Sequence, residues 1–207
     1  MSLKQQKEQE IKFEVEGSVG DPTFEDIEHV ATASKPSIME LDARYFDTPD
    51  LTLSHAKITL RRRTGGKDAG WHLKTNTSDG RQETHAPLDS SEENQVPDAL
   101  RQLVAEHVGE EPLVEIARIR NRRAETLLLT HDGTAIAEFC DDHVEAQNSN
   151  EHHARRWREW EVEATQQAQD LGIAAEILAS ALEVLGSMQG VEKATRASKL
   201  QRALGRA

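Results

Sequence analysis

The stretch Ile58-Thr-Leu-Arg-Arg-Arg-Thr, followed by Gly65-Gly-Lys-Asp-Ala-Gly and then Trp71-His-Leu-Lys, decides how this chain is organised. Two strand-like runs flank a glycine-rich turn, which is typical of a β-hairpin. Successive side chains of a strand point to opposite faces. One face of the hairpin is therefore polar and rich in cations: Thr59, Arg61, Arg63, His72 and Lys74. The other face is apolar: Ile58, Leu60, Trp71 and Leu73.

Charged residues gather on one face of several other strand-like runs. These charged faces are Glu8, Glu10 and Lys12; Arg81, Glu83 and His85; Arg118, Arg120 and Arg122; Glu138 and Asp142; and Glu159, Glu161 and Glu163. A solvated outer face is the ordinary explanation for such a pattern. Here acids and bases lie on separate strands, and like charges side by side on a surface repel one another. An antiparallel barrel satisfies all of them, with charged faces around a wet lumen and apolar faces outward beneath helices.

Apolar spacing and helix start signals predict the remaining elements. Helices are expected over 23–33, 51–56, 91–108, 167–186 and 198–204. In the helix over 91–108, Pro97 is expected to mark the true first turn. Further strands are expected over 39–47, 113–123, 126–131, 134–142 and 158–164, with a flexible polar segment over 145–154. The fold class is therefore α+β, and residues 1–207 are expected to form a single domain.

Composition narrows the class of ligand. The chain has 37 acidic and 25 basic residues, and its formal net charge is −12. That balance argues against a general nucleic-acid binder, which needs a dominant positive field. It allows a small polyanion held by a local cluster of Arg and Lys. The single cysteine, Cys140, and the lack of a signal or membrane-spanning pattern predict a cytoplasmic protein in a reduced compartment.

The two kinds of charged face suggest complementary roles in the lumen. Cationic walls would hold a chain of phosphates: Arg61, Arg63, Lys74, Arg120 and Arg122. Carboxylates would bind hard divalent cations, Mg²⁺ or Mn²⁺, which bridge to phosphate oxygens: Glu8, Glu10, Glu161 and Glu163.

In these motifs the sequence resembles the CYTH superfamily, also called triphosphate tunnel metalloenzymes. The matching residues are Glu8, Glu10 and Lys12; Tyr45-Phe-Asp-Thr-Pro; Arg61 and Arg63; Lys74; Glu83; Arg120 and Arg122; Asp142; Glu161 and Glu163; and Ser198-Lys199. The ordered set spans Glu8 to Leu204 and is specific. The resemblance implies an eight-stranded, antiparallel, closed β-barrel, or tunnel, that binds triphosphates with divalent metal.

The resemblance also implies an enzyme, and we expect a metal-dependent triphosphatase acting on inorganic tripolyphosphate. The alternatives are adenylate cyclase, thiamine or nucleoside triphosphatase, and a non-catalytic polyphosphate-binding module. The candidate catalytic residues are Lys12 and Glu83. The candidate substrate-binding residues are Arg61, Arg63, Lys74, Arg120, Arg122 and Lys199. The candidate metal ligands are Glu8, Glu10, Asp142, Glu161 and Glu163.

Three of these assignments have an alternative residue. Glu159 shares the face of Glu161 and Glu163, Arg118 competes with Arg120 and Arg122, and Lys193 competes with Lys199. The expected partner is a small polyanionic triphosphate, with neither nucleic acid nor membrane. A homodimer and a CHAD domain in a longer parent protein are left open.

Overall fold

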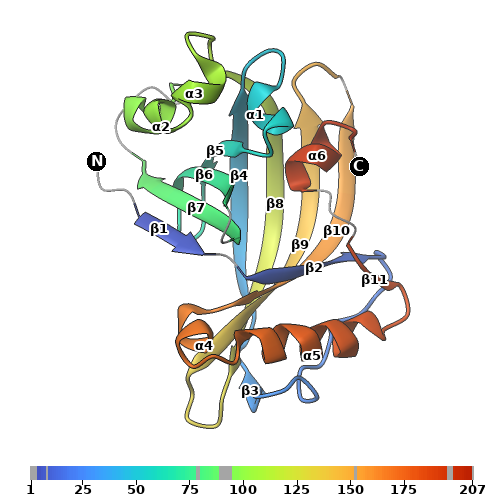
Figure 1. The fold of residues 1–207 in the computed structure, drawn as a ribbon. Coiled ribbons are helices and arrows are strands. Elements are labelled where there is room, and N and C mark those ends of the chain that lie inside the picture. Colours follow the sequence, from blue (N-terminus) through green and yellow to red (C-terminus); the bar gives the residue numbers. More distant parts are fainter. Residues whose placement is uncertain are drawn as a thin grey trace.

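The computed structural model of the chain, shown in Figure 1, describes residues 4–7, 9–77, 80–88, 95–151, 153–194 and 198–206. Its strands are β1 (Lys4–Lys7), β2 (Glu10–Val15), β3 (Thr32–Ala33), β4 (Ser37–Asp47), β5 (Thr59–Thr64), β6 (Gly70–Thr77), β7 (Gly80–Pro87), β8 (Val114–Leu129), β9 (Ala135–Asn148), β10 (Ala154–Ala164) and β11 (Val191–Lys193). Its helices are α1 (Thr52–His55), α2 (Asp98–Leu103), α3 (Ala105–Val108), α4 (Gln166–Asp170), α5 (Ala174–Gly186) and α6 (Lys199–Ala203).

The strands form one antiparallel sheet in the order β1-β7-β6-β5-β4-β8-β9-β10-β2-β11, with β3 beside β8. β1 pairs with β7 and β2 pairs with β10, although β1 and β2 are consecutive along the chain. The chain itself therefore bridges the two ends of the curved sheet. In the described residues no ladder joins β1 to β2, so hydrogen bonds do not close the sheet. The antiparallel sheet and its flanking helices are as predicted, and its long strands are β2 and β4 to β10.

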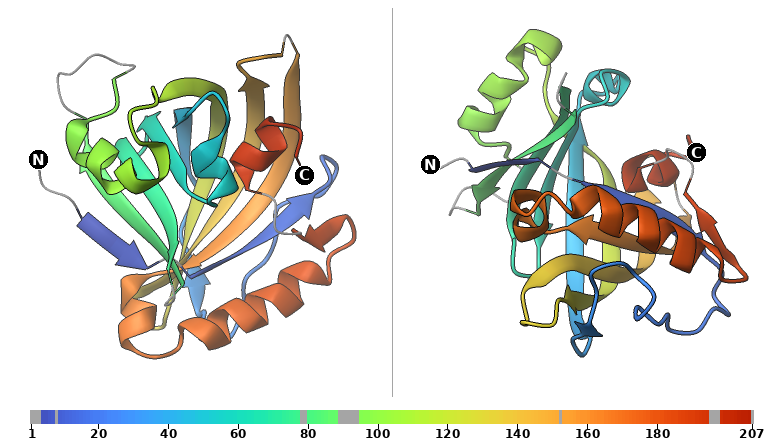
Figure 2. Two further views of the ribbon diagram at one scale, coloured as in Figure 1. Left: turned by 45° about the horizontal axis from the view of Figure 1, so that its top comes forward. Right: turned by 60° about the horizontal axis from the view of Figure 1, so that its bottom comes forward.

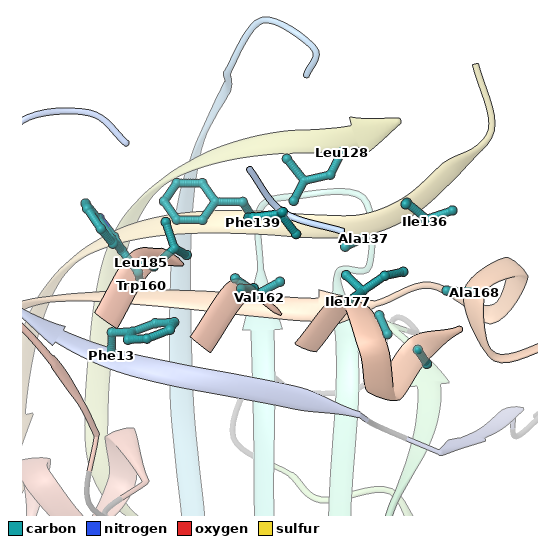
Figure 3. Packing of buried hydrophobic residues seen from close by; sticks show 14 of the residues in the cluster. Phe13, Leu128, Ile136, Ala137, Phe139, Trp160, Val162, Ala168, Ile177 and Leu185 are labelled. Atoms are coloured by element: carbon teal, nitrogen blue, oxygen red, sulfur yellow. The ribbon is translucent and has the colours of Figure 1, made fainter. Parts of the chain in front are cut away.

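Two helical layers cover the outer face of the sheet, at opposite ends of the molecule (Figures 1 and 2). Under α5, the stripe Ala174, Ile177, Ala181 and Leu185 packs on apolar residues of β2, β9 and β10 (Figure 3). Under α2 and α3, Leu100, Val104 and Val108 pack on the apolar face of the β5–β6 hairpin. The predicted alternation of this hairpin is confirmed, since Leu60, Trp71 and Leu73 are buried beneath these helices.

The short helix α6 packs on the opposite, inner face of the sheet. Its residues Leu200 and Ala203 contact an apolar cluster that includes Ala43, Tyr45 and Ile119. A capping box fixes the start of α6, because Ser198 Oγ accepts a hydrogen bond from Gln201 N and Ser198 N donates to Gln201 Oε1. The first residue of the helix, Lys199, is thereby held over the inner face.

Two glycines in the hairpin are required by their surroundings. Gly65 has φ +81, and a Cβ there would lie 2.0 Å from the carbonyl oxygen of Glu40. A Cβ on Gly70 would lie 2.2 Å from His85 Nε2. The first glycine lets the turn pass close to β4, and the second leaves room for the His85 ring on β7.

Several predicted elements are wrong. Residues 23–33 form turns and β3 in place of a helix, and His29 has φ 68, outside the right-handed helical region. The predicted helix 167–186 is split into α4 and α5 at Gly172, which has φ +75. The strands predicted over 113–123 and 126–131 are one strand, β8, and the segment expected to be flexible contributes to β9. Residues 91–94 of the predicted helix 91–108 lie outside the described residues, and α2 begins after Pro97.

The packing beneath α5 predicts a stability difference between two leucines. Leu185 is fully buried, whereas Leu171 at the end of α4 is 62% exposed. We expect Leu185→Ala to lower the free energy of unfolding by about 2–5 kcal/mol, because a buried leucine leaves a cavity when truncated. Leu171→Ala should change it by less than about 0.5 kcal/mol. Urea denaturation measures both, and equal losses would contradict this packing.

Candidate functional site

The inner faces of the strands enclose a cavity of about 90 Å³, which we call the lumen. Its cationic lining residues are Lys12, Arg61, Arg63, Lys74, Arg123 and Lys199. Its acidic lining residues are Glu10, Asp68, Glu83, Glu161 and Glu163. Two larger cavities have mixed linings: one of about 720 Å³ lies on the outer side of β8 to β10, and one of about 710 Å³ lies between the ends of β2, β9 and β10 beside α6. We place the site in the lumen because it gathers buried charges of both signs from distant parts of the chain.

One wall of the lumen comes from β5 and carries two buried guanidinium groups. Register places Arg61 opposite His72 and Arg63 opposite Gly70, so both arginines share the inner face. Within the described part of the chain, the Nε atoms of Arg61 and Arg63 are buried and have no hydrogen-bond partner. Burial, together with the neighbouring Arg61, lowers the pKa of Arg63 to about 10, which leaves it charged at neutral pH. These two N–H groups are donors for which the described residues supply no acceptor.

The same wall continues into β6 and β7, where Glu83 lies among three basic groups. His72 Nδ1 lies 2.5 Å from Glu83 Oε1, and Lys74 Nζ lies 3.5 Å from Glu83 Oε2. Arg61 Nη2 is 3.8 Å from Glu83 Oε1. Burial is the main reason that the pKa of His72 is lowered to about 4, and the positive charges of Arg61 and Arg63 act in the same direction.

The opposite wall is a network of buried ion pairs from β2, β8, β9, β10 and α6. Arg123 donates to both oxygens of Asp142, at 2.7 and 2.6 Å, and to Glu161 Oε2 at 2.6 Å. Lys12 binds Glu161 and also lies 3.1 Å from Glu10. Burial alone would raise the pKa of Asp142 and Glu161, but the surrounding cations dominate and lower both. Burial alone would lower the pKa of Lys12, but the neighbouring Glu161 and Glu10 raise it.

Lys199 occupies the centre of a cluster that could otherwise bind a metal ion. Ligand atoms of Asp142, Glu159 and Glu161 lie within 4.8 Å of one another. Lys199 Nζ lies 2.9, 2.5 and 2.8 Å from these three carboxylates, in that order. The ammonium group therefore takes the position that a cation would need.

A different group of carboxylates, the pair Glu10 and Glu163, fits a divalent cation better than the cluster around Lys199. Glu10 and Glu163 are direct cross-strand partners on β2 and β10, and both line the lumen. Like charges at such positions are unfavourable, and a divalent cation would add to the charge of Lys12, whose Nζ lies 3.1 Å from Glu10. Mg²⁺ is commonly held by one or two carboxylates together with phosphate oxygens and water. The pair at Glu10 and Glu163 matches that donor set.

The structure places most of the predicted site residues around the lumen. Those that line it are Glu10, Lys12, Arg61, Arg63, Lys74, Glu83, Glu161, Glu163 and Lys199. Asp142 is buried directly behind them, bound to Arg123 and Lys199. Glu8 lies outside the described residues. Of the open alternatives, Glu159 contacts Lys199, whereas Lys193 is exposed on β11.

The predicted lumen positions of Arg120 and Arg122 are wrong. Their side chains are 58% and 53% exposed and lie near Asp42 and Glu40 of β4, on the outer face of the sheet. Arg118 is on the same outer face. The inner face of β8 carries other residues: Ala117, Ile119, Asn121 and Arg123. The prediction assumed that apolar positions always face outward, but here Ile119 packs inward beneath α6.

Asn121 and Arg123 on β8 are therefore polar lining residues that the sequence reasoning missed, and Asp68 in the turn between β5 and β6 is another. Arg123 joins the carboxylate network, and Asn121 Oδ1 is buried without a hydrogen-bond partner in the described part of the chain. The signal was present in the alternation of Ala117, Ile119, Asn121 and Arg123. To assign that face to the lumen, one would have had to expect that a helix packs on the inner face of the sheet.

An antiparallel sheet wrapped around a lumen of buried Arg, Lys, Asp and Glu defines a class of charge-lined tunnel proteins. The chain matches the CYTH domain model over residues 6–196 and belongs to that family. Two uncharacterized proteins from Mycobacterium tuberculosis, strains CDC 1551 and H37Rv, are each 42% identical to it over 167 residues. That match covers 75% of this chain and 32% of each relative, so the chain spans about a third of their length.

The fold is also similar to that of a solved structure. The crystal structure of a candidate adenylate cyclase from Bacillus halodurans aligns with a TM-score of 0.58 and 18% identity. The alignment covers 96% of this chain and 97% of that protein. At this identity the similarity supports the tunnel fold.

In the described residues, no helix is both long and apolar enough to cross a membrane.

The carboxylate network predicts a large effect of removing its central cation. We expect Lys199→Met to lower the free energy of unfolding by about 3–5 kcal/mol, because buried carboxylates lose their partner. Lys193→Met is the matched control, since Lys193 is exposed, and should have little effect. Chemical denaturation of both variants measures the difference. A Lys199→Met protein as stable as the control would show that the ammonium does not neutralise this cluster.

Proposed function

We propose that this chain is a divalent-metal-dependent triphosphatase that hydrolyses inorganic tripolyphosphate in the lumen. The observation that carries the proposal is the pair of buried, unpartnered Nε–H groups of Arg61 and Arg63, a statement that concerns the described residues. Buried donors without acceptors are costly, and a phosphate chain supplies acceptors with the required negative charge. Lys74 and Lys12 add point charges along the same space.

Metal dependence is supported by the donor set at Glu10 and Glu163. A divalent cation bound there would neutralise charge on the phosphoryl oxygens and help to orient the chain. The lumen cations, above all Arg61, Arg63 and Lys74, would stabilise the charge on the transferred phosphoryl group.

The electrostatics separate the candidate proton carriers. Lys12 has a raised pKa and stays protonated, so we assign it to phosphate binding rather than to proton abstraction. Glu161 is neutralised by Lys12, Lys199 and Arg123, and its lowered pKa makes it a weak base. Glu83 is left as the group best suited to exchange a proton with substrate or water.

The lining favours an inorganic chain over a nucleotide. Of the described residues that line the lumen, Tyr45 is the one aromatic side chain, and it is hydrogen-bonded to Arg61. A base or a thiazole ring would need an apolar or aromatic surface, and the polar lining offers little of either. A small polyanion needs only the charged groups that are present.

The arginine pair on β5 gives the first functional prediction. We expect Arg61→Ala to reduce kcat for tripolyphosphate by about 10²–10³-fold, because a preorganised donor to the phosphoryl oxygens is lost. Arg62→Ala is the matched control: Arg62 is the next residue along, and it points to the opposite face. Orthophosphate and pyrophosphate released in the presence of Mg²⁺ or Mn²⁺ are measured. Unchanged turnover in Arg61→Ala would overturn the assignment.

The carboxylate pair gives a second functional prediction. A chelator should abolish hydrolysis, and added Mg²⁺ or Mn²⁺ should restore it. Glu163→Gln should raise the metal concentration needed for half-maximal rate by roughly tenfold or more, because one anionic ligand is removed. Glu192→Gln, an exposed position on β11, should leave this concentration unchanged. Full activity in chelator would exclude metal dependence.

A further inference from the structure

His72 makes two polar contacts inside the wall of the lumen, one from each ring nitrogen. The side chain is 2% exposed. Its Nε2 lies 3.0 Å from the backbone carbonyl oxygen of Asp68, and its Nδ1 lies 2.5 Å from Glu83 Oε1. Glu83 itself lines the lumen, so the buried ring connects a lumen carboxyl group to the turn between β5 and β6.

The two contacts determine how many protons His72 and Glu83 must carry between them. A carbonyl oxygen can only accept, so Nε2 must carry a hydrogen that it donates to Asp68. Nδ1 then holds a lone pair unless the ring is an imidazolium, and an ionised Glu83 offers only acceptors. Two acceptors at 2.5 Å would repel each other. One further proton must therefore lie between Nδ1 and Oε1.

The groups around the pair oppose a full charge on the ring but favour one on the carboxyl. Arg61 and Lys74 lie 3.8 and 3.5 Å from the oxygens of Glu83 and favour its ionised form. Burial, with the charges of Arg61 and Arg63, disfavours the imidazolium. Asp68 contributes a negative charge beside the ring, and the His85 ring from β7 is centred 4.9 Å from that of His72.

We propose that His72 and Glu83 share one proton, and that His72 is the positioning residue that keeps Glu83 a proton donor towards the phosphate chain. This inference rests on the proposed triphosphatase function. His72 acts through Glu83 and does not itself face the substrate. Without the ring, the positive charges of Lys74 and Arg61 would favour the ionised form of Glu83. Glu83 would then lose its proton at a lower pH and could no longer act as a donor.

The shared proton has a defined place in hydrolysis. The oxygen of water bonds to the terminal phosphorus, and the bond from that phosphorus to the bridging oxygen breaks. The bridging oxygen keeps the electron pair and takes the proton from Glu83. This oxygen then leaves as part of pyrophosphate. The protons of the water remain on orthophosphate or pass to solvent, and solvent returns one proton to the pair. No oxidant or further reactant is needed.

The first test is the pH dependence of tripolyphosphate hydrolysis by the full chain with Mg²⁺. We expect His72→Asn to lower kcat above neutral pH by about 10- to 100-fold, as for loss of a general acid, and to move the basic limb to lower pH. The KM for tripolyphosphate should change by less than about threefold, because the phosphate-binding cations are intact. His143→Asn is the control, since His143 is 53% exposed on the outer face. A wild-type profile in His72→Asn would overturn the inference.

A second variant covers the case in which His72→Asn does not fold. Glu83→Gln keeps a hydrogen-bond donor towards Nδ1 but holds no proton that can leave. We expect it to melt near the wild-type temperature, to lose kcat by a similar factor and to lose the basic limb. Wild-type kcat in Glu83→Gln would overturn the donor role.

A third measurement does not depend on activity. Nitrogen-15 NMR of histidine-labelled chain, with His72→Asn to assign the signals, should show Nε2 protonated at neutral pH and Nδ1 with a shift between those of a protonated and an unprotonated ring nitrogen. An unprotonated Nε2, or an Nδ1 shift typical of a free lone pair, would overturn the shared proton. A wild-type chain that releases no orthophosphate, yet shows this signal, would overturn the proposed hydrolysis and the donor role together, and would leave the shared proton established.

Discussion

The structure depends on the mutual neutralisation of charges that are buried inside a curved sheet. Removing a carboxylate or a guanidinium from water is expensive, and the cost is offset only when each group has oppositely charged partners with good geometry. Arg123 illustrates this, since it binds Asp142 and Glu161 through several short contacts. Because the partners come from different strands and from α6, the network also fixes how these elements are arranged.

This constraint explains why charged and apolar residues alternate along the strands, which is the pattern from which the fold was predicted. Each charged inner face requires an apolar outer face that helices can cover, as α5 covers β2, β9 and β10. The hairpin at Arg61 and Arg63, the first strand at Glu10 and Lys12, and the last long strand at Glu161 and Glu163 all follow that rule. Local pattern was sufficient there because one side of each strand is consistently apolar.

The rule fails on β8 because α6 places apolar contacts inside the sheet. Ala117 and Ile119 pack inward against this helix, so the same register that points Arg123 into the lumen points Arg120 and Arg122 to solvent. A one-residue change of register reverses every side chain of a strand. The split of the last long helix at Gly172 and the turns over 23–33 were missed for a related reason. Apolar spacing records which residues are buried, and it does not record the backbone path that buries them.

The same charge balance explains why ligand binding in the lumen would be an exchange of partners. The cations around the lumen are already bound to carboxylates, as Lys12 is to Glu161 and Lys74 is to Glu83. A phosphate chain that takes over these cations would leave the carboxylates without partners, which is costly in a buried site. A divalent cation at Glu10 and Glu163 and a proton on Glu83 would each remove part of that excess negative charge. In the proposed reaction, metal and proton would therefore accompany the polyanion for one electrostatic reason, and a selectivity for polyanions would follow from it.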